Sequence, residues 1–329
     1  MRPPGFWDAP PDAPGWQARA LSPLGRLYAS ATARRVRRPG HRAGIPIISV
    51  GNLEAGGTGK TPTVIALLQR IAGAHVVTRG YGGSLEGPVR VDETRHRAEE
   101  TGDEPLLLSA FAPVWVSRDR AAGVRAAEAA GATAVILDDA HQNPDVRKDL
   151  SIVVTEAARA FGNGRCIPAG PLREPVEAGL ARADLLLTIG APAAQATFGE
   201  GWGALLDERL PPRIMGRIMP LRTGMPWQGL RVYAFAGIGR PAKFFDTLRG
   251  LGVTLRGAVQ LDDHQPLGEA LLARLEREAL AENAQLVTTE KDMVRLPPSW
   301  RGKVLPLPVR LEWEDSAALG PALSRIGLG

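Results

Sequence analysis

The chain has 329 residues, of which 44% are hydrophobic and 23% charged, and this size and mixture are typical of a globular protein with two compact domains. Its single cysteine, Cys166, excludes an internal disulfide, and no apolar stretch reaches the roughly 18 to 20 residues that a membrane-spanning helix needs. We expect a cytosolic setting, without a secretory signal. The net charge of +5 favours an anionic partner: nucleic acid, a phospholipid surface or a phosphorylated substrate.

Residues 1–15 are rich in proline and glycine and predict an irregular lead-in. The next segment predicts an amphipathic helix, because its apolar residues recur at steps of three and four, namely Trp16, Ala20, Leu24, Leu27 and Ala31. A basic cluster follows, formed by Arg34, Arg35, Arg37 and Arg38. Such a helix lies on an anionic membrane or docks on the protein's own core, and the residues alone favour the core.

The rest of the chain alternates strands with helices. In the first half we expect strands at 45–50, 75–78, 114–117, 134–137 and 152–155, and helices at 62–72 and 119–130. After a segment rich in glycine and proline, the second half predicts strands at 185–189, 231–236 and 286–289, and helices at 242–251 and 267–282. This alternation predicts an α/β fold with a mostly parallel sheet covered on both faces, and a second α/β unit beyond a boundary near residues 153–160.

A phosphate-binding loop lies between the first strand and its helix, with the sequence Gly56-Gly57-Thr58-Gly59-Lys60-Thr61. Its glycines let backbone N–H groups turn toward phosphate oxygens, Lys60 can reach the β- and γ-phosphates, and the Thr61 hydroxyl can ligate Mg²⁺. The following helix adds the partial positive charge of its N-terminus. The strict pattern has glycine where this chain has Glu54, so we expect that side chain to point away from the phosphates. The loop predicts ATP and Mg²⁺ as cofactors; the alternative is a glycine-rich turn without a nucleotide.

Two acidic residues, Asp138 and Asp139, follow the predicted strand at 134–137. A P-loop enzyme needs a carboxylate at the end of a buried strand to hold Mg²⁺ directly or through water. In isolation such a pair more often forms a turn. Together with the upstream loop, the pair predicts a metal site.

The order of the motifs along the chain resembles the tetraacyldisaccharide 4'-kinase family, the lipid A 4'-kinases. The motifs that carry the resemblance are residues 49–52, 56–62, 79–83, 102–105, 138–139, 161–164, 168–175, 237–239, 263–264 and 289–292. The resemblance implies transfer of the ATP γ-phosphate to the 4'-hydroxyl of a tetraacyldisaccharide 1-phosphate, which gives lipid IVA. It also implies a peripheral monomeric enzyme on the cytoplasmic face of the inner membrane. A substrate with four acyl chains does not leave the bilayer cheaply, so the resemblance favours membrane contact for the N-terminal helix.

The resemblance further implies a P-loop NTPase-like core joined to a smaller α/β domain by a two-stranded linker. On this chain it places the core at residues 1–151, the linker strands at 152–157 and 303–309, and the second domain at 158–302. A C-terminal helix at about 310–329 would then return to the core.

The family pattern also implies roles for single residues. Asp103 is the expected general base, and His264 is its partner from across the domain cleft, so domain closure becomes part of the mechanism. Lys60 completes the catalytic set. Glu174 is the expected additional Mg²⁺ ligand, and Arg173 neutralises phosphate charge. Without the resemblance, Asp103 would be a helix cap and Arg173–Glu174 an exposed salt bridge.

Side chains that follow predicted strand ends are expected to contact the lipid head group, because ligands of open α/β sheets bind there. These are Arg79, Tyr81, Arg118 and Arg120.

The chain departs from the family pattern at His141, a titratable residue beside the metal acids where an apolar one is usual, and at Glu54. We expect the turn after Asp139 to be rebuilt or the activity to be altered. The main alternative is a partition- or maturation-type P-loop ATPase, but those carry a lysine where this chain has Ala55. A non-catalytic nucleotide-binding regulator is a further alternative, and no nucleic-acid-binding motif is present.

Overall fold

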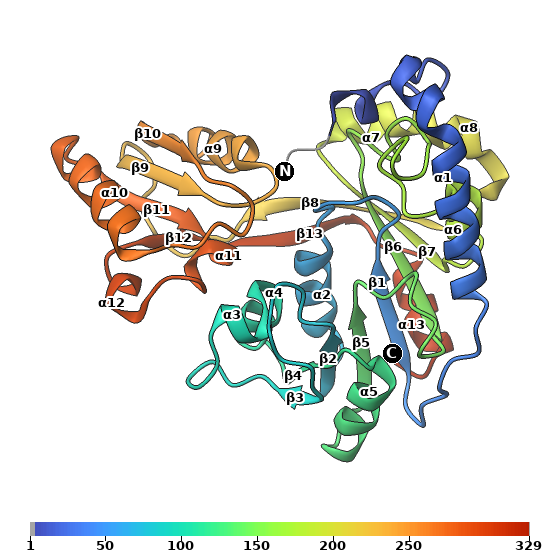
Figure 1. Cartoon of the computed structure of the whole chain (residues 1–329). Helices are drawn as coiled ribbons and strands as arrows, with labels where there is room; N and C mark the ends of the chain where they lie inside the picture. Colours follow the sequence, from blue (N-terminus) through green and yellow to red (C-terminus); the bar gives the residue numbers. More distant parts are fainter. Residues whose placement is uncertain (1–3, 329) are drawn as a thin grey trace.

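The structure is a computed structural model that describes residues 4–328. Within that range a nine-stranded sheet forms the centre of the molecule (Figure 1). Its strands, in spatial order, are β13 (Val309–Asp315), β8 (Arg213–Pro220), β7 (Leu185–Ile189), β6 (Leu150–Glu156), β1 (Ile47–Gly51), β5 (Ala134–Asp138), β2 (Ala74–Thr78), β4 (Val114–Val116) and β3 (Val89–Arg90). Neighbouring strands from β8 to β4 are parallel, and only the two edge strands β13 and β3 pair antiparallel. The predicted α/β class with a mostly parallel sheet is confirmed.

Both faces of this sheet are buried, and the central strands explain why. Alternate residues of β5 belong to different hydrophobic clusters, with Ile136 in the cluster on one face and Leu137 in that on the other. One face is covered by α2 (Lys60–Leu68), α4 (Asp103–Leu108) and α13 (Leu319–Arg325). The other is covered by α5 (Arg120–Ala129), α6 (Val176–Leu180) and α7 (Pro192–Phe198). Near-continuous apolar runs are what strands buried on two faces require.

Shorter helical segments complete the core. They are η1 (Gly5–Asp8), α3 (Ala98–Thr101), η2 (Gly199–Gly203), α8 (Ala204–Leu206) and η3 (Asp207–Arg209).

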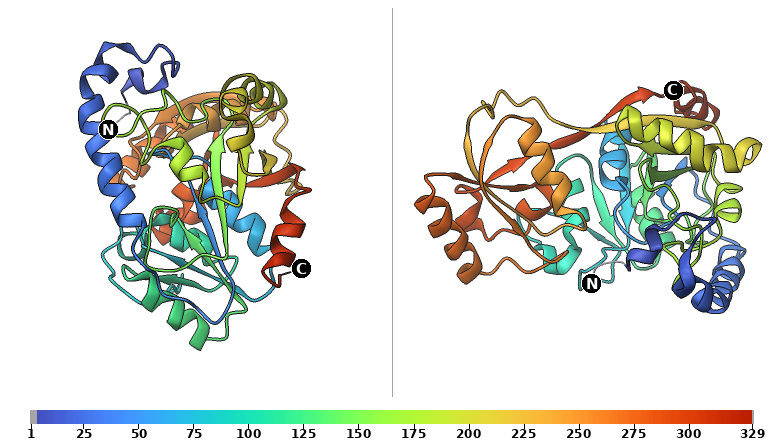
Figure 2. Two further views of the ribbon diagram at one scale, coloured as in Figure 1. Left: turned by 90° about the vertical axis from the view of Figure 1, so that its right-hand side faces the viewer. Right: turned by 90° about the horizontal axis from the view of Figure 1, so that it is seen from above.

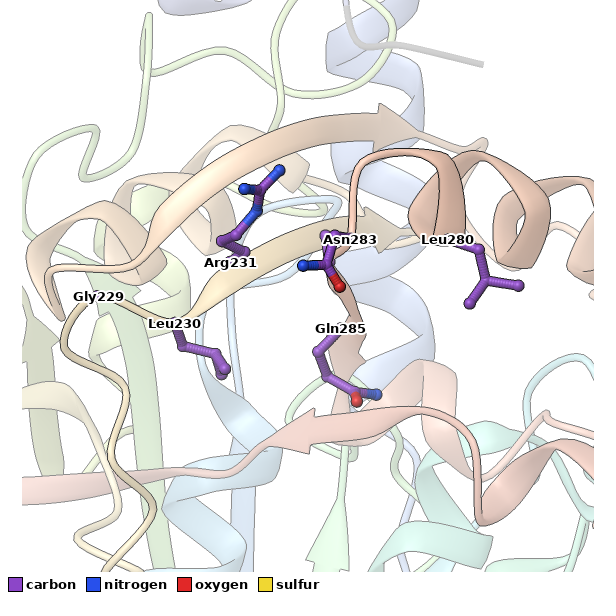
Figure 3. Close-up of a pocket in the computed structure, with 7 residues that line it drawn as sticks. Gly229, Leu230, Arg231, Leu280, Asn283 and Gln285 are labelled. Carbon is purple, nitrogen blue, oxygen red and sulfur yellow. The ribbon is translucent and has the colours of Figure 1, made fainter.

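The second domain is a four-stranded parallel sheet in the order β10 (Thr254–Gln260), β9 (Arg231–Ala236), β11 (Gln285–Thr289) and β12 (Leu305–Leu307). Its helices are α9 (Pro241–Gly250), α10 (Glu269–Ala281), α11 (Glu290–Met293) and α12 (Pro298–Arg301). Helix α9 packs Phe244 and Phe245 on one face of the sheet, and α10 packs Leu272 and Leu275 on the other. A hollow of about 450 Å³ lies at the end of this domain where β9 and β11 begin (Figure 3). None of the predicted site residues lines it.

The linker between the domains differs from the prediction. The strand expected as the first linker strand, 152–157, is β6 in the middle of the core sheet, where all its residues are buried. The second expected linker strand, 303–309, contains β12, which belongs to the smaller sheet, and only its last residue begins β13. The two parts are joined instead by the antiparallel pair β8–β13, visible as two long strands in Figure 1 and Figure 2. Residues 158–220 therefore lie in the core, and 310–315 form a strand before α13 returns to it.

The N-terminal helix α1 (Gly15–Val36) lies along the outside of the core. It docks through small residues spaced seven apart, because Ala18, Gly25 and Thr32 are its buried positions. A Cβ atom at Gly25 would lie 2.8 Å from the Cys166 carbonyl oxygen, so the close approach requires glycine.

The predicted apolar stripe of α1 faces solvent. Trp16 is 74% exposed, Leu24 53% and Leu27 69%. The prediction that this stripe packs on the core, which the residues alone favoured, is wrong because the opposite, small-residue face docks instead. Among the described helices, none combines the length and the apolar character needed to cross a bilayer.

Candidate active site

The phosphate-binding loop connects β1 to α2 at the carboxyl edge of the core sheet. Gly56 and Gly59 have φ angles of +127° and +97°, which side chains rarely tolerate. Asn52 braces the loop: its Nδ2 donates to the Gly56 carbonyl at 3.2 Å, and its Oδ1 accepts from Lys60 Nζ at 3.2 Å. Asn52 was predicted only as part of a motif, without this role, because its partner is four residues away in an irregular loop.

Lys60 points toward the acidic strand end. Its Nζ lies 3.5 Å from Asp139 Oδ1, and Arg173 Nη1 donates to the same carboxylate at 2.9 Å. Burial raises the pKa of Asp139, but Lys60 and Arg173 outweigh it and hold the pKa below its ordinary value. The predicted Lys60, Asp139 and Arg173 therefore lie together, and Arg173 is part of the loop's charge network rather than an exposed pair.

Asp138 differs from its neighbour, because its Oδ1 is buried without a hydrogen-bond partner among the described residues. Burial first, and then the Asp139 charge, raise its pKa to about 7. A buried carboxylate oxygen without a donor fits a cation that the structure does not contain. Thr61, in the first turn of α2, is the hydroxyl expected beside it. No group of three or more acidic, histidine or cysteine side chains that could hold a metal ion occurs within residues 4–328.

Glu174, the expected additional Mg²⁺ ligand, lies in a buried network of hydrogen bonds. Its two oxygens accept from Arg182 Nη2 at 2.9 and 2.8 Å, and Gln142 Nε2 donates to Oε1 at 2.9 Å. The side chain is buried in this network. Both oxygens accept hydrogen bonds, and the network fixes the loop around Gln142.

The two departures from the family pattern are buried below the site. Glu54 turns its carboxyl group toward β6, where it accepts from the Thr155 hydroxyl at 2.5 Å, and burial raises its pKa to about 7. His141 places Nε2 2.9 Å from the Gly179 carbonyl oxygen, and burial lowers its pKa to about 3. It is therefore neutral at physiological pH. The rebuilt turn appears at Asp139, whose φ is +50°.

The domain cleft brings Asp103 and His264 together. Asp103 is the first residue of α4, after Gly102 at φ +90°, and its carboxylate makes no capping bond. His264, at φ +59°, places Nδ1 2.9 Å from Asp103 Oδ2. This hydrogen bond raises the pKa of His264 above its ordinary value. The predicted pair is assembled, and the helix-cap alternative for Asp103 is wrong.

Further charged residues surround this pair from the second domain. Arg295, almost fully buried, has its Nε 3.5 Å from Asp103 Oδ2 and pairs with Asp292. Lys291 Nζ lies 2.8 Å from Glu104 Oε1. Lys291 was predicted only as part of the 289–292 motif and Arg295 not at all, because these contacts cross between segments far apart in the sequence.

The residues expected at the lipid head group divide into two kinds. Tyr81 is 76% exposed, and the centre of its ring lies 6.0 Å from that of the His264 ring. Arg79 and Arg118 are also exposed, and Arg118 pairs with Glu86. Arg120 is buried and donates to the Asp139 carbonyl at 2.9 Å. Arg120 therefore supports the acidic turn and does not reach the surface, which corrects its expected substrate contact.

A strand, a phosphate loop and a helix at the edge of a parallel sheet, with a carboxylate at the neighbouring strand end, define the class of P-loop nucleotide-dependent phosphotransferases. A family model described as tetraacyldisaccharide-1-P 4'-kinase (LpxK) matches residues 17–326. The chain belongs to this tetraacyldisaccharide 4'-kinase family.

Individual relatives agree. The tetraacyldisaccharide 4'-kinase of Dinoroseobacter shibae is 65% identical over 99% of this chain and 98% of its own length. That of Jannaschia sp. is 55% identical over 99% of each chain. The crystal structure of "apo" form LpxK from Aquifex aeolicus in complex with ATP matches with a TM-score of 0.73 and 25% identity, covering 94% of this chain and 99% of that one. The family comprises ATP-dependent kinases of lipid A biosynthesis, so the predicted enzyme class is confirmed and the partition-type ATPase alternative is wrong.

Proposed function

We propose that the chain transfers the γ-phosphate of ATP to the 4'-hydroxyl of tetraacyldisaccharide 1-phosphate, giving lipid IVA. The observation that carries the proposal is the 2.9 Å contact between Asp103 of the core and His264 of the second domain. Asp103 begins α4, which covers the same face of the core sheet as α2, the helix that follows the phosphate loop. The proposal thus combines a phosphate loop with a proton acceptor, the two things that phosphoryl transfer to a hydroxyl requires.

The roles follow from the contacts. Lys60 binds the β- and γ-phosphates, and the loop glycines donate backbone N–H groups to them. Thr61, Asp138 and Asp139 would hold Mg²⁺, which when bound neutralises charge on the phosphate oxygens. Asp103 receives the hydroxyl proton. The head group of the lipid contacts the exposed side chains at the rim, Arg79, Tyr81 and Arg118. The protein acts as a monomer, because one chain supplies both halves of the site.

The N-terminal helix supplies the membrane contact in this proposal. Its solvent-facing stripe contains Trp16, Leu24 and Leu27, and Arg34 and Arg35 in its last turn are exposed. Apolar side chains flanked by arginines suit an anionic bilayer surface. The protein would therefore work as a peripheral enzyme on the cytoplasmic face of the inner membrane, where its substrate's acyl chains stay in the lipid.

The kinase proposal is tested with purified protein, ATP, Mg²⁺ and tetraacyldisaccharide 1-phosphate in detergent micelles. We expect a lipid product heavier by one phosphate, seen by mass spectrometry, and none from Lys60→Ala. ATP hydrolysis that ignores the lipid, without phosphorylated lipid, would contradict the proposal.

The membrane proposal is tested by vesicle sedimentation of the Leu24→Ser/Leu27→Ser double variant. Removing two exposed leucines is expected to weaken binding to anionic vesicles by about tenfold or more. Leu205→Ser/Leu280→Ser is the matched control, because both leucines are exposed elsewhere, at 60% and 71%. Equal binding by the two double variants would show that the stripe does not touch the bilayer.

A further inference from the structure

Lys291 occupies the centre of the charged cluster around Asp103 and His264, where the two domains meet. It lies in the short helix α11, which Thr289 caps by accepting from the Asp292 backbone N–H. Its Nζ is 2.8 Å from Glu104 Oε1, 3.3 Å from His264 Nε2 and 3.8 Å from Asp263 Oδ1. With 22% of its side chain exposed, it is held on three sides.

The contact with His264 limits where the imidazole proton can be. A lysine ammonium has three donors and no acceptor, so this 3.3 Å contact favours an Nε2 that offers its lone pair, while Asp263 Oδ1 lies farther from the same nitrogen, at 3.7 Å. The proton of the neutral ring then sits on Nδ1, which donates to Asp103 Oδ2 at 2.9 Å. A ring protonated on both nitrogens would set two positive groups 3.3 Å apart.

We propose that Lys291, held by Glu104, is a positioning residue that keeps His264 as the neutral Nδ1–H tautomer and so makes Asp103 the proton acceptor of the reaction. This inference rests on the proposed kinase function. It adds Lys291 to that proposal, as the residue that occupies the only lone pair of the neutral imidazole and so leaves Asp103 to take the proton.

The phosphoryl-transfer step then needs no proton to move to His264. The 4'-hydroxyl oxygen forms a bond to the γ-phosphorus, and its proton moves to Asp103. The bond from the γ-phosphorus to the bridging oxygen breaks, and ADP leaves with the electron pair. His264 and Arg295 both contact Oδ2 of the Asp103 carboxylate. Oδ1 is therefore the oxygen that receives the proton.

Opposing charges act on the His264 ring from each side. The hydrogen bond to Asp103 is the largest effect and raises its pKa, burial and Lys291 lower it, and Asp263 raises it. Glu104 pairs with Lys291 on one side of the ring, and Arg295 contacts Asp103 on the other. The centre of the Tyr81 ring lies 6.0 Å from that of the His264 ring. Asp103 and Asp263 thus favour protonation, and Lys291 is the cation in direct contact that opposes it.

The test measures the tautomer directly, by ¹⁵N NMR of histidine side chains in the full-length protein. The His264 signal is assigned by its loss in His264→Gln. We expect an Nδ1–H tautomer in the native protein. In Lys291→Met the neutral ring should become a mixture of tautomers, and its pKa should rise by about 0.5 to 1 unit. Lys291→Arg should restore the native tautomer. Lys303→Met, which removes a surface lysine paired with Glu276, is the control.

The kinetic readout is the pH dependence of kcat. Because imidazolium beside Asp103 weakens that base, the acidic limb of the Lys291→Met profile should move to higher pH by a similar amount. An unchanged tautomer and an unchanged limb in Lys291→Met would overturn the inference. Failure of the kinase proposal has a different signature: the native protein would form no phosphorylated lipid, whereas the tautomer measurement needs no turnover at all. Native-rate turnover by Asp103→Asn would instead overturn the inference that Asp103 accepts the proton. Unchanged ATP-analogue binding shows that each variant is folded.

Discussion

The two carboxylates at the ends of the site, Asp138 and Asp103, are held in opposite ways. Asp138 is buried with one oxygen that lacks a donor in the described part of the chain, whereas Asp103 is contacted by a histidine and an arginine. In the proposed mechanism, nucleotide and Mg²⁺ would supply the missing partner of Asp138, while the acceptor end is assembled by the protein itself. The difference teaches that ligands would complete the first end, whereas the approach of the two domains supplies the second.

The strongest test of the acceptor end is Asp103→Asn. The amide still accepts a hydrogen bond from His264, but it cannot take a proton, so we expect kcat to fall by about 10²- to 10⁴-fold. The KM for ATP should change little, because Lys60 and the loop are untouched. Steady-state kinetics with the lipid in micelles measure both. Asp246→Asn, in an exposed pair with Arg249, is the control, and a parallel loss of ATP affinity would indicate a structural role for Asp103.

For the metal end, the expected effect of a substitution is on stability, and it is a gain rather than a loss. The folded-state pKa of Asp138 is about 7, above its ordinary value of 3.8, so its contribution to stability is full below about pH 4 and is lost as pH rises through 7. Without Mg²⁺, Asp138→Asn should therefore raise the free energy of unfolding by about 1–3 kcal/mol at pH 8, and by less at pH 5.

Adding Mg²⁺ and ATP should reverse the order of the two proteins. The wild-type carboxylate gains its missing partner, and the asparagine does not, so ligand stabilisation should be smaller in the variant. Thermal unfolding in EDTA and in Mg²⁺-ATP measures both states. Equal ligand-induced shifts would remove Asp138 from the metal site.

The same contrast separates what the sequence predicted from what it did not. Lys60 and Asp138 were predictable because local patterns, a glycine loop and an acidic strand end, place them at one sheet edge. The Asp103–His264 pair came only from the family resemblance, since these residues are 161 positions apart. Arg182, which takes both oxygens of Glu174, is missed by any motif because it acts through packing.

The linker was misplaced for a related reason. The apolar run at 152–154 in β6 predicts a strand, but the pattern does not say which sheet the strand joins. The true linker strands, β8 and β13, carry arginine, glycine and proline or acidic residues, because a bridge between domains is only partly buried. Mixed burial weakens the periodic signal, so partly exposed strands are the ones that were missed.

The smallest expected effect concerns His141, beneath the metal end. His141→Leu removes the contact with the Gly179 carbonyl and should lower the free energy of unfolding by about 1 kcal/mol at pH 8. The folded-state pKa of His141 is about 3, below its ordinary value of 6.5, so the histidine loses stability as pH falls from 6.5 toward 3. The difference between variant and wild type should therefore shrink or reverse at pH 5, which denaturant unfolding in EDTA can measure.

Because the ring is neutral and turned away from Asp138, kcat at pH 8 should stay within about twofold of the native value. A large loss of kcat at unchanged stability would show instead that His141 acts on the metal acids, and the metal end would then depend on a residue that the contacts assign to packing.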